Sequence, residues 1–250
     1  MAPCLLPSPS MNPDFELDLY LIRHGESANN VAGDSQSPWN PDPPLTDRGR
    51  NQVRALGRRL IAEGVAFDRV YSSSLQRSVH SARELLLAMG MAESKFESTD
   101  ALDEIRVAVR DGRPFDQRLN PEERDRFGAS GAWWVYGPTA GRDSESERLL
   151  ERRVIGWIED VLIYDHAFSS QAGAKRVAVV SHGHAIRSAL HAILGFDSRY
   201  TRRIQLDNAA VSRMRFSARG WFPVSINDSW HTHATGDIHR ESPHHPMGGL

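Results

Sequence analysis

The stretch DLYLIRHGESANN (residues 18–30) passes from an apolar run directly into arginine, histidine and glycine. A second stretch, RVAVVSHGHAIR (residues 176–187), ends its apolar run in the same way. Both runs lack polar alternation, which is typical of strands buried on both faces of a parallel sheet. Because ligands of open α/β sheets bind beyond the carboxyl ends of the strands, the two His-Gly endings are candidates for one shared site.

Helical patterns separate the predicted strands. A third short run, RVY at residues 69–71, is also rich in strand-forming residues. Apolar residues recur at helical spacing, with capping or stop residues at the ends, over residues 46–64, 74–90, 145–166 and 184–195. Strands that alternate with helices predict an α/β fold. We expect a three-layer sandwich with a mostly parallel central sheet and helices on both faces.

One domain is expected over residues 17–228. Residues 1–16 contain helix-breaking prolines and lack the basic start and apolar core of a signal peptide, so they predict a disordered extension. Residues 105–142 are charged and punctuated by Pro and Gly, which indicates an insertion beside the site. Its tryptophan pair either walls a substrate pocket or packs the insertion onto the domain. Residues 229–250 are interpreted as a polar, histidine-rich tail.

The bulk composition excludes several partners. Thirty Lys and Arg balance 32 Asp and Glu, for a formal net charge of −2, which gives no electrostatic reason to expect nucleic acid or an anionic membrane. No apolar stretch approaches the ~18 to 20 residues that span a bilayer. The single cysteine, Cys4, excludes internal disulfides and a cysteine metal cluster. We expect a cytoplasmic protein, and a homodimer is compatible with this composition.

Polar side chains at the predicted strand ends suggest a binding site. Neighbouring strands lie ~4.8 Å apart, so His24 and His182 would face one another across a pocket if their strands are neighbours. Gly183 would let a ligand approach the backbone closely. Arg77 falls in the first turn of a predicted helix, where a cation is unfavourable unless an anion is also bound. The alternative is that Arg77 is a solvated surface residue.

These residue types suit phosphoryl transfer. Two arginines, two histidines and a helix terminus can hold a compact dianion such as phosphate. Guanidinium groups can stabilise the charge that a metal stabilises elsewhere, so we expect neither metal nor cofactor. A neutral imidazole can attack phosphorus as a nucleophile, and a carboxyl group can protonate the leaving alcohol and later activate water.

Five motifs in order, LIRHGESANN, LTDRG, SSSLQRS, ALDEI and VVSHGHAIR, resemble those of the histidine phosphatase superfamily, the phosphoglycerate mutase-like proteins. The resemblance covers about residues 17–228. It implies that His24 is the nucleophile that becomes phosphohistidine and that Glu104 is the proton donor. It also implies a set of residues that bind the phosphoryl group: Arg23, Arg77, His182 and Asn30.

The resemblance also carries structural implications and one departure. Glu145 and Arg153 fit a helix motif that the family uses structurally, and Gly49 would end the LTxxG turn. Many small phosphatases of the family continue after the acid as EIxxGxWEGR, whereas residues 104–113 here read EIRVAVRDGR. Arg110 therefore replaces an aromatic residue and is a candidate for binding a second negative group on the substrate.

We interpret the chain as a metal-independent phosphomonoester hydrolase that acts on a small phosphorylated metabolite. The alternatives are a cofactor-dependent phosphoglycerate mutase and a non-catalytic protein that binds a phosphorylated ligand. Mere binding does not need Glu104, and the sequence shows no paired arginines for a mutase's grip on its substrate. We expect partial burial to raise the pKa of Glu104. His184 either lines the pocket or only packs in the fold.

Overall fold

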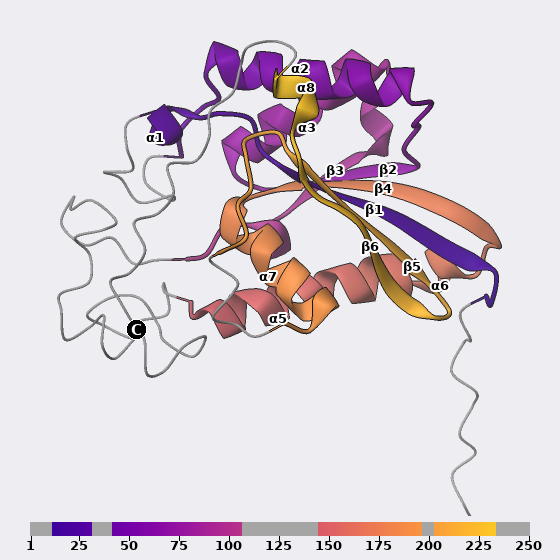
Figure 1. The fold of residues 1–250 in the computed structure, drawn as a ribbon. Coiled ribbons are helices and arrows are strands. Elements are labelled where there is room, and N and C mark those ends of the chain that lie inside the picture. The colour runs from indigo at the N-terminus through magenta and orange to yellow at the C-terminus, as the bar shows by residue number, and fades with distance from the viewer. Residues whose placement is uncertain (1–11, 32–41, 107–144, 197–202, 234–250) are drawn as a thin grey trace, which may run out of the picture.

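The computed structural model describes residues 12–31, 42–106, 145–196 and 203–233 (Figure 1). Arg110 and almost all of the predicted insertion lie outside the described residues. Most of the predicted extension and most of the predicted tail lie outside them as well.

A mixed sheet of six strands forms the centre of the fold, in the order β3-β2-β4-β1-β5-β6. Its strands are β1 (Phe15–Arg23), β2 (Arg69–Ser73), β3 (Phe96–Thr99), β4 (Gly173–Ser181), β5 (Val211–Ser217) and β6 (Gly220–Asp228). The pairs from β3 through β1 are parallel, and β5 and β6 extend the sheet with antiparallel pairs. The predicted mostly parallel sheet is confirmed.

β1 and β4 are neighbours along their whole length. Their register runs from Phe15 opposite Gly173 to Arg23 opposite Ser181. Both strands lie inside the sheet and are covered by helices, which explains why their apolar runs show no polar alternation. Because the strands end in register, His24 and His182 leave the sheet side by side.

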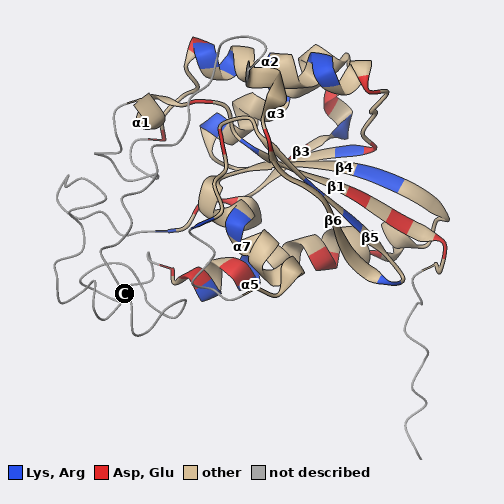
Figure 2. Cartoon of the chain, viewed as in Figure 1, with Lys and Arg blue, Asp and Glu red and all other residues tan. Residues whose placement is uncertain are grey.

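Helices cover both faces of the sheet (Figure 1). α2, α3 and α8 lie on one face, and α5, α6 and α7 lie on the other. The helices are α1 (Ala28–Val31), α2 (Asp47–Ala62), α3 (Gln76–Met89), α5 (Glu147–Ile158), α6 (His166–Ser169), α7 (Gly183–Leu194) and α8 (Trp230–His233). Both signs of charge occur on α2 and on α5 (Figure 2). Because helices lie on both faces of the sheet, the architecture is the predicted three-layer α/β sandwich.

The helix ends follow from local sequence chemistry. The Thr46 hydroxyl caps α2 by accepting from the Gly49 amide at 3.0 Å. Gly90, at φ 64°, ends α3 in the left-handed conformation that glycine adopts without steric cost. The predicted helix 145–166 is shorter than expected, because α5 passes at Glu159–Ile163 into a π-helical turn.

Two apolar cores anchor the sheet, one on each face. Along β1, Leu19 and Leu21 point into the core beneath α5 and α7, whereas Tyr20 and Ile22 point into the core beneath α2 and α3. Full burial of a leucine or isoleucine side chain is worth roughly 1.5 to 3 kcal/mol relative to exposure. The strands are thus held from both sides, and their ends form a rigid base for the loops that follow.

The edges of the described fold differ from the sequence boundaries. The short strand β3 and the antiparallel strands β5 and β6 were not predicted. Residues 229–233, assigned to the tail, instead form the end of the fold, with Ser229, His231 and Thr232 buried. Within the described ranges, no helix is long and apolar enough to cross a membrane.

Candidate active site

The two histidines predicted to share a site are adjacent. The ring centroids of His24 and His182 lie 5.1 Å apart. His24 directly follows β1, and His182 is the residue before α7. Both side chains are buried. The strand pairing therefore creates a paired-imidazole site at the carboxyl edge of the sheet.

Hydrogen bonds fix the state of His24. Its Nδ1 lies 2.7 Å from the carbonyl oxygen of Gly25, so Nδ1 donates and Nε2 keeps its lone pair. Burial lowers the pKa of His24 well below its ordinary value, and the nearby Arg77 and Arg23 lower it further. The backbone carbonyl of His24 accepts from the Asn208 side chain at 3.1 Å. His24 is thus a neutral, oriented imidazole.

Two glycines bring the loop after His24 against α2. A Cβ on Gly25 would lie 2.3 Å from the Gly49 oxygen, and a Cβ on Gly49 would lie 2.0 Å from the Glu26 oxygen. Gly49 therefore serves close backbone packing within α2 rather than the end of a loop. This packing holds the chain that carries the nucleophile candidate.

Arg77 is buried rather than solvated, with 4% of its side chain exposed. Its Nη1 donates to the Asp42 carboxylate at 3.0 Å, and the same carboxylate accepts from the Gln76 amide. Burial lowers the pKa of Arg77, whereas Glu104 and Asp42 raise it. An anion does occupy this helix end, and in the structure it is Asp42, which the sequence analysis did not identify.

Arg23 approaches the site from the end of β1. Its guanidinium donates to the carbonyl oxygen of Leu206, and the residue is 7% exposed. A Cβ on Gly183 would lie 3.4 Å from the Arg187 guanidinium and 3.8 Å from that of Arg23. A Cβ at the start of α7 would therefore make ordinary van der Waals contact with two arginine side chains.

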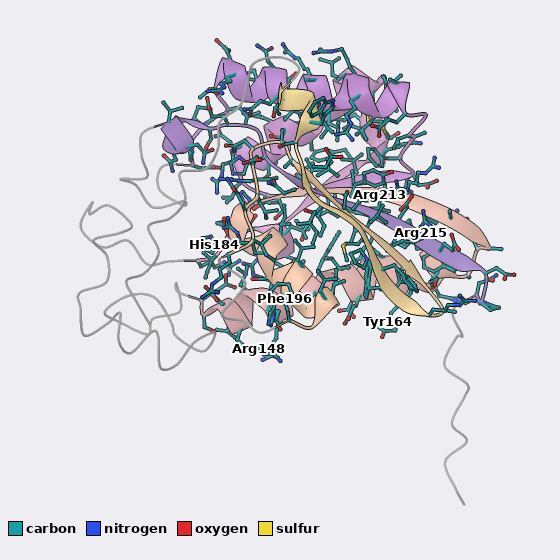
Figure 3. The ribbon with its side chains drawn as sticks, in the orientation of Figure 1. Arg148, Tyr164, His184, Phe196, Arg213 and Arg215 are labelled. Carbon is teal, nitrogen blue, oxygen red and sulfur yellow. The ribbon has the colours of Figure 1, made fainter. Side chains whose placement is uncertain are left out.

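The buried Glu104 pairs with the partly exposed His184, which lies at the amino end of α7 (Figure 3). The His184 Nδ1 lies 3.7 Å from the Glu104 Oε2, and the His184 amide donates to the same oxygen at 3.3 Å. The Glu104 Oε1 accepts from the Ile105 amide at 2.9 Å. His184 thus belongs to the site.

The predicted rise in the pKa of Glu104 is wrong. Burial does raise it, but His184, His182 and the Ile105 amide together lower it more, so the pKa lies well below its usual value. The same pairing has the opposite effect on His184. Burial lowers the pKa of His184, but Glu104 raises it more. In the described site the proton of the pair therefore resides on His184.

Arg153 stabilises the turn that carries Glu104. Its guanidinium forms two bonds with the Glu145 carboxylate, at 2.8 and 2.7 Å. It also donates to three backbone carbonyls in the turn before Glu104, those of Asp100, Ala101 and Asp103. The contacts of Arg153 and Glu145 therefore hold the turn before Glu104 against α5.

Asn30 is held close to the loop that follows His24. Its amide oxygen accepts from the Ser27 amide and hydroxyl, both at 3.0 Å, and from Asn208 at 3.2 Å. Within the described residues no hydrogen bond is recorded for its amide nitrogen. That nitrogen is the group that can donate to a ligand.

The serines that surround the histidines were not among the predicted site residues. Ser73 and Ser78 lie 2.7 and 3.2 Å from the His182 Nε2. Ser81 accepts from the Gly25 amide at 3.0 Å. The signal was the density of serines in SSSLQRSVHS (residues 72–81), which places hydroxyl groups at the strand end and along one helix. Across the described ranges, no cluster of three or more His, Cys, Asp or Glu is arranged to hold a metal ion.

Comparison with known proteins defines the family. The chain matches the histidine phosphatase superfamily (branch 1) over residues 19–229, which is most of its length. It therefore belongs to that superfamily.

A curated relative agrees with this placement, and solved structures share the fold. The chain is 30% identical over 225 residues to a probable phosphoglycerate mutase, GpmB, of Yersinia pestis, covering 86% of this chain and 94% of the relative. A phosphoserine phosphatase of Entamoeba histolytica has a similar fold, with a TM-score of 0.69 and 21% identity over 86% and 98% of the two chains. A phosphoglycerate mutase of Bacillus anthracis is similar as well, with a TM-score of 0.69 and 24% identity over 90% and 99%. These two structures show the shared fold.

Proposed function

We propose that the protein is a metal-independent phosphomonoester hydrolase that acts on a small phosphorylated metabolite through a phosphohistidine at His24. The observation that carries the proposal is the state of His24. It is a neutral imidazole whose Nδ1 donates to a backbone carbonyl, beside two buried arginines. Such an imidazole has its nucleophilic lone pair on Nε2, next to groups that attract a phosphoryl dianion.

In the first step, the Nε2 of His24 attacks phosphorus. The P–N bond forms while the bond from phosphorus to the alcohol oxygen breaks, and Glu104 gives its proton to that oxygen. Arg23 and Arg77 stabilise the charge on the equatorial oxygens, since phosphoryl transfer depends mainly on positioning and charge stabilisation. The amide nitrogen of Asn30 donates a hydrogen bond to the phosphoryl group.

The proton that Glu104 delivers comes from its pair with His184. In the described site the carboxyl group is ionised and His184 holds the proton. A phosphoryl dianion bound nearby disfavours a second negative charge, so it raises the pKa of Glu104. Transfer of the proton from the His184 Nδ1 to the Glu104 Oε2 then requires the two atoms to close from 3.7 Å to hydrogen-bonding distance or to be bridged by a water.

In the second step, water attacks the phosphohistidine. Glu104, now ionised, takes a proton from the water, and the P–N bond breaks to release phosphate and neutral His24. Glu104 then passes this proton back to His184, so each residue returns to its initial protonation state. Arg110 is still a candidate for binding a second negative group on the substrate.

A second candidate function is phosphoglycerate mutase. The name of the 30% identical relatives favours it. A mutase would use the same His24 chemistry but return the phosphoryl group to an acceptor alcohol. The two functions differ in whether water or an alcohol reaches the phosphohistidine.

A product analysis tests the proposal and separates the candidates. Purified protein is incubated with a panel of sugar phosphates, nucleotides, phosphoserine and 3-phosphoglycerate, and both free phosphate and isomerised product are measured. The proposal predicts release of phosphate from at least one ester, abolished in His24→Ala. Rapid conversion of 3- to 2-phosphoglycerate with little free phosphate would establish the mutase instead.

A further inference from the structure

His182 lies at the end of a buried chain of hydrogen bonds that the reaction scheme above does not use. Its Nε2 lies 2.7 Å from the Ser73 hydroxyl, and that hydroxyl lies 2.8 Å from an oxygen of the Asp103 carboxylate. Asp103, Ser73 and His182 are each at most 1% exposed. A carboxylate in such a position is costly to bury unless its hydrogen bonds are specific.

The direction of the chain follows from what each atom can donate. An ionised Asp103 only accepts, so the single hydroxyl proton of Ser73 points to it. The Ser73 oxygen then has two lone pairs to offer. One accepts from the Leu75 amide at 3.1 Å, and the other faces the His182 Nε2. His182 completes the chain by donating from Nε2 to Ser73 at 2.7 Å, the shorter of its two hydroxyl contacts, since Ser78 lies 3.2 Å from the same nitrogen.

The other ring nitrogen of His182 is left for a ligand. Its Nδ1 is buried and has no hydrogen-bond partner within the described residues. The ring that carries it lies beside His24, where the phosphoryl group is transferred. A neutral ring with its proton on Nε2 would present a lone pair to the phosphoryl oxygens and repel them. Attraction requires a proton on both nitrogens.

We propose that Asp103 is a positioning residue that acts through Ser73 to fix one proton on the Nε2 of His182. The Nδ1 atom then takes up a second proton and donates a hydrogen bond to the phosphoryl group. This inference rests on the proposed phosphohistidine chemistry at His24 and deepens it. The second proton comes from solvent or from the monoanionic form of the substrate. Asp103 then partly balances the imidazolium that forms.

The surroundings of His182 explain why a negative charge beside its imidazolium form matters. Burial lowers the pKa of His182 well below its ordinary value, so the ring is neutral before a ligand binds. The charged and titratable groups near His182 come from three parts of the fold. Arg77 lies on α3, and Arg23 and His24 lie at the end of β1. Asp103 and Glu104 follow β3. Among these groups Glu104 raises the pKa of His182, whereas Arg77, His24 and Arg23 lower it.

The pH dependence of phosphate binding is the test. Inorganic phosphate is used as a competitive inhibitor, and its inhibition constant is measured from pH 5 to 9 for the wild type and for Asp103→Asn. Asparagine can keep its oxygen toward Ser73 and donate its amide to the Ser74 hydroxyl, which lies 2.9 Å from the second carboxylate oxygen. The substitution thus removes the charge while keeping the bonds.

The variant should bind phosphate about tenfold more weakly at pH 7, and the loss of affinity with rising pH should begin about one unit lower. The titration of phosphate itself is common to both proteins and cancels in the comparison. Ser73→Ala should have a similar effect, and the double variant should be no worse than the single variants, because both changes break one chain.

Ser74→Ala is the matched control. It removes the hydroxyl donor to Asp103, keeps the backbone amide donor and leaves the link to His182 intact, so it should leave the pH profile of phosphate binding unchanged. A wild-type pH profile in both Asp103→Asn and Ser73→Ala would overturn the inference. So would a double variant whose fold-loss of phosphate affinity equals the product of the two single losses. If phosphohistidine still forms on His24 in that case, only the role of Asp103 fails. If no phosphohistidine forms in the wild type, the proposed function fails instead.

Discussion

Glu104 and His184 form a pair in which the Nδ1 of the partly exposed His184 lies 3.7 Å from the buried carboxylate. The pair couples the proposed acid to an imidazole whose pKa is raised by the carboxylate. Glu104 has its pKa lowered and His184 has its pKa raised, so the proton that the pair holds resides on the imidazole. Two predictions depend on this arrangement.

Substitution of His184 should narrow the pH range of activity. In the wild type the pair loses its last proton only above the ordinary histidine pKa of 6.5, because the pKa of His184 is raised. In His184→Gln only the carboxyl group of Glu104 can keep a proton, and it does so at lower pH. The alkaline limb of kcat/KM for an alkyl phosphate should therefore move down by about one unit or more. An unmoved limb would show that His184 does not supply the proton.

Glu104→Gln should discriminate between leaving groups. Glutamine cannot protonate the alcohol, so turnover of an alkyl phosphate should fall by about 10²- to 10⁴-fold. Turnover of an aryl phosphate such as p-nitrophenyl phosphate should fall much less, since its leaving group needs little protonation. The measurement is a comparison of initial rates for the two esters. Equal losses for both would indicate that Glu104 has a structural role.

Activity should persist when metal ions are removed. The charge at the phosphoryl group is met by Arg23 and Arg77, so EDTA treatment should leave the rate of phosphate release unchanged within about twofold. Arg77→Lys should lose at least about tenfold, because lysine cannot reproduce the fork geometry of a guanidinium. Loss of activity in EDTA that zinc or magnesium restores would contradict the proposed mechanism.

His231 should make the fold sensitive to acid. It is 4% exposed, and burial together with the nearby Arg59 lowers the pKa of His231 to about 4. The unfolded chain binds a proton at this residue below pH 6.5 while the folded chain does not. Its contribution to stability is therefore complete above pH 6.5 and is lost as the pH falls towards 4. Between pH 7.5 and 4.5 this amounts to about 2 to 3 kcal/mol.

Denaturant unfolding of the wild type and His231→Gln at these two pH values measures that contribution. Other buried histidines contribute equally to both proteins, so the difference between the two pH-dependent losses isolates His231. The wild type should lose about 2 to 3 kcal/mol more than the variant. Parallel losses would show that His231 is not neutral in the folded protein.

The sequence predicted the parallel centre of the fold because its signals are local. Thr46 caps a helix, Gly90 ends one, and unbroken apolar runs mark the two buried strands. The antiparallel strands were missed because β5 carries Arg213 and Arg215 among its apolar residues (Figure 3). Arg213 pairs with the buried Asp18 of β1, a contact that no local pattern indicates.

The residues of the candidate site could be predicted from the sequence, but their protonation states and mutual contacts could not. His24 and His182 follow from the strand endings, since parallel strands end at the same edge. The pKa of Glu104 depends on His184, which is distant in sequence and reaches it only through the packing of α7. The link from Asp103 to His182 through Ser73 likewise exists only in the folded chain.

Trapping of the phosphorylated protein tests the central claim most directly. Glu104→Gln is mixed with p-nitrophenyl [³²P]phosphate, quenched in alkali within milliseconds to seconds, and digested for peptide mapping, with His24→Ala as the control. Because this variant cannot activate water, an alkali-stable, acid-labile label should accumulate to nearly one per chain on His24 and be absent from His24→Ala. Release of phosphate from the wild type with no label on His24 in either protein would contradict a phosphohistidine mechanism.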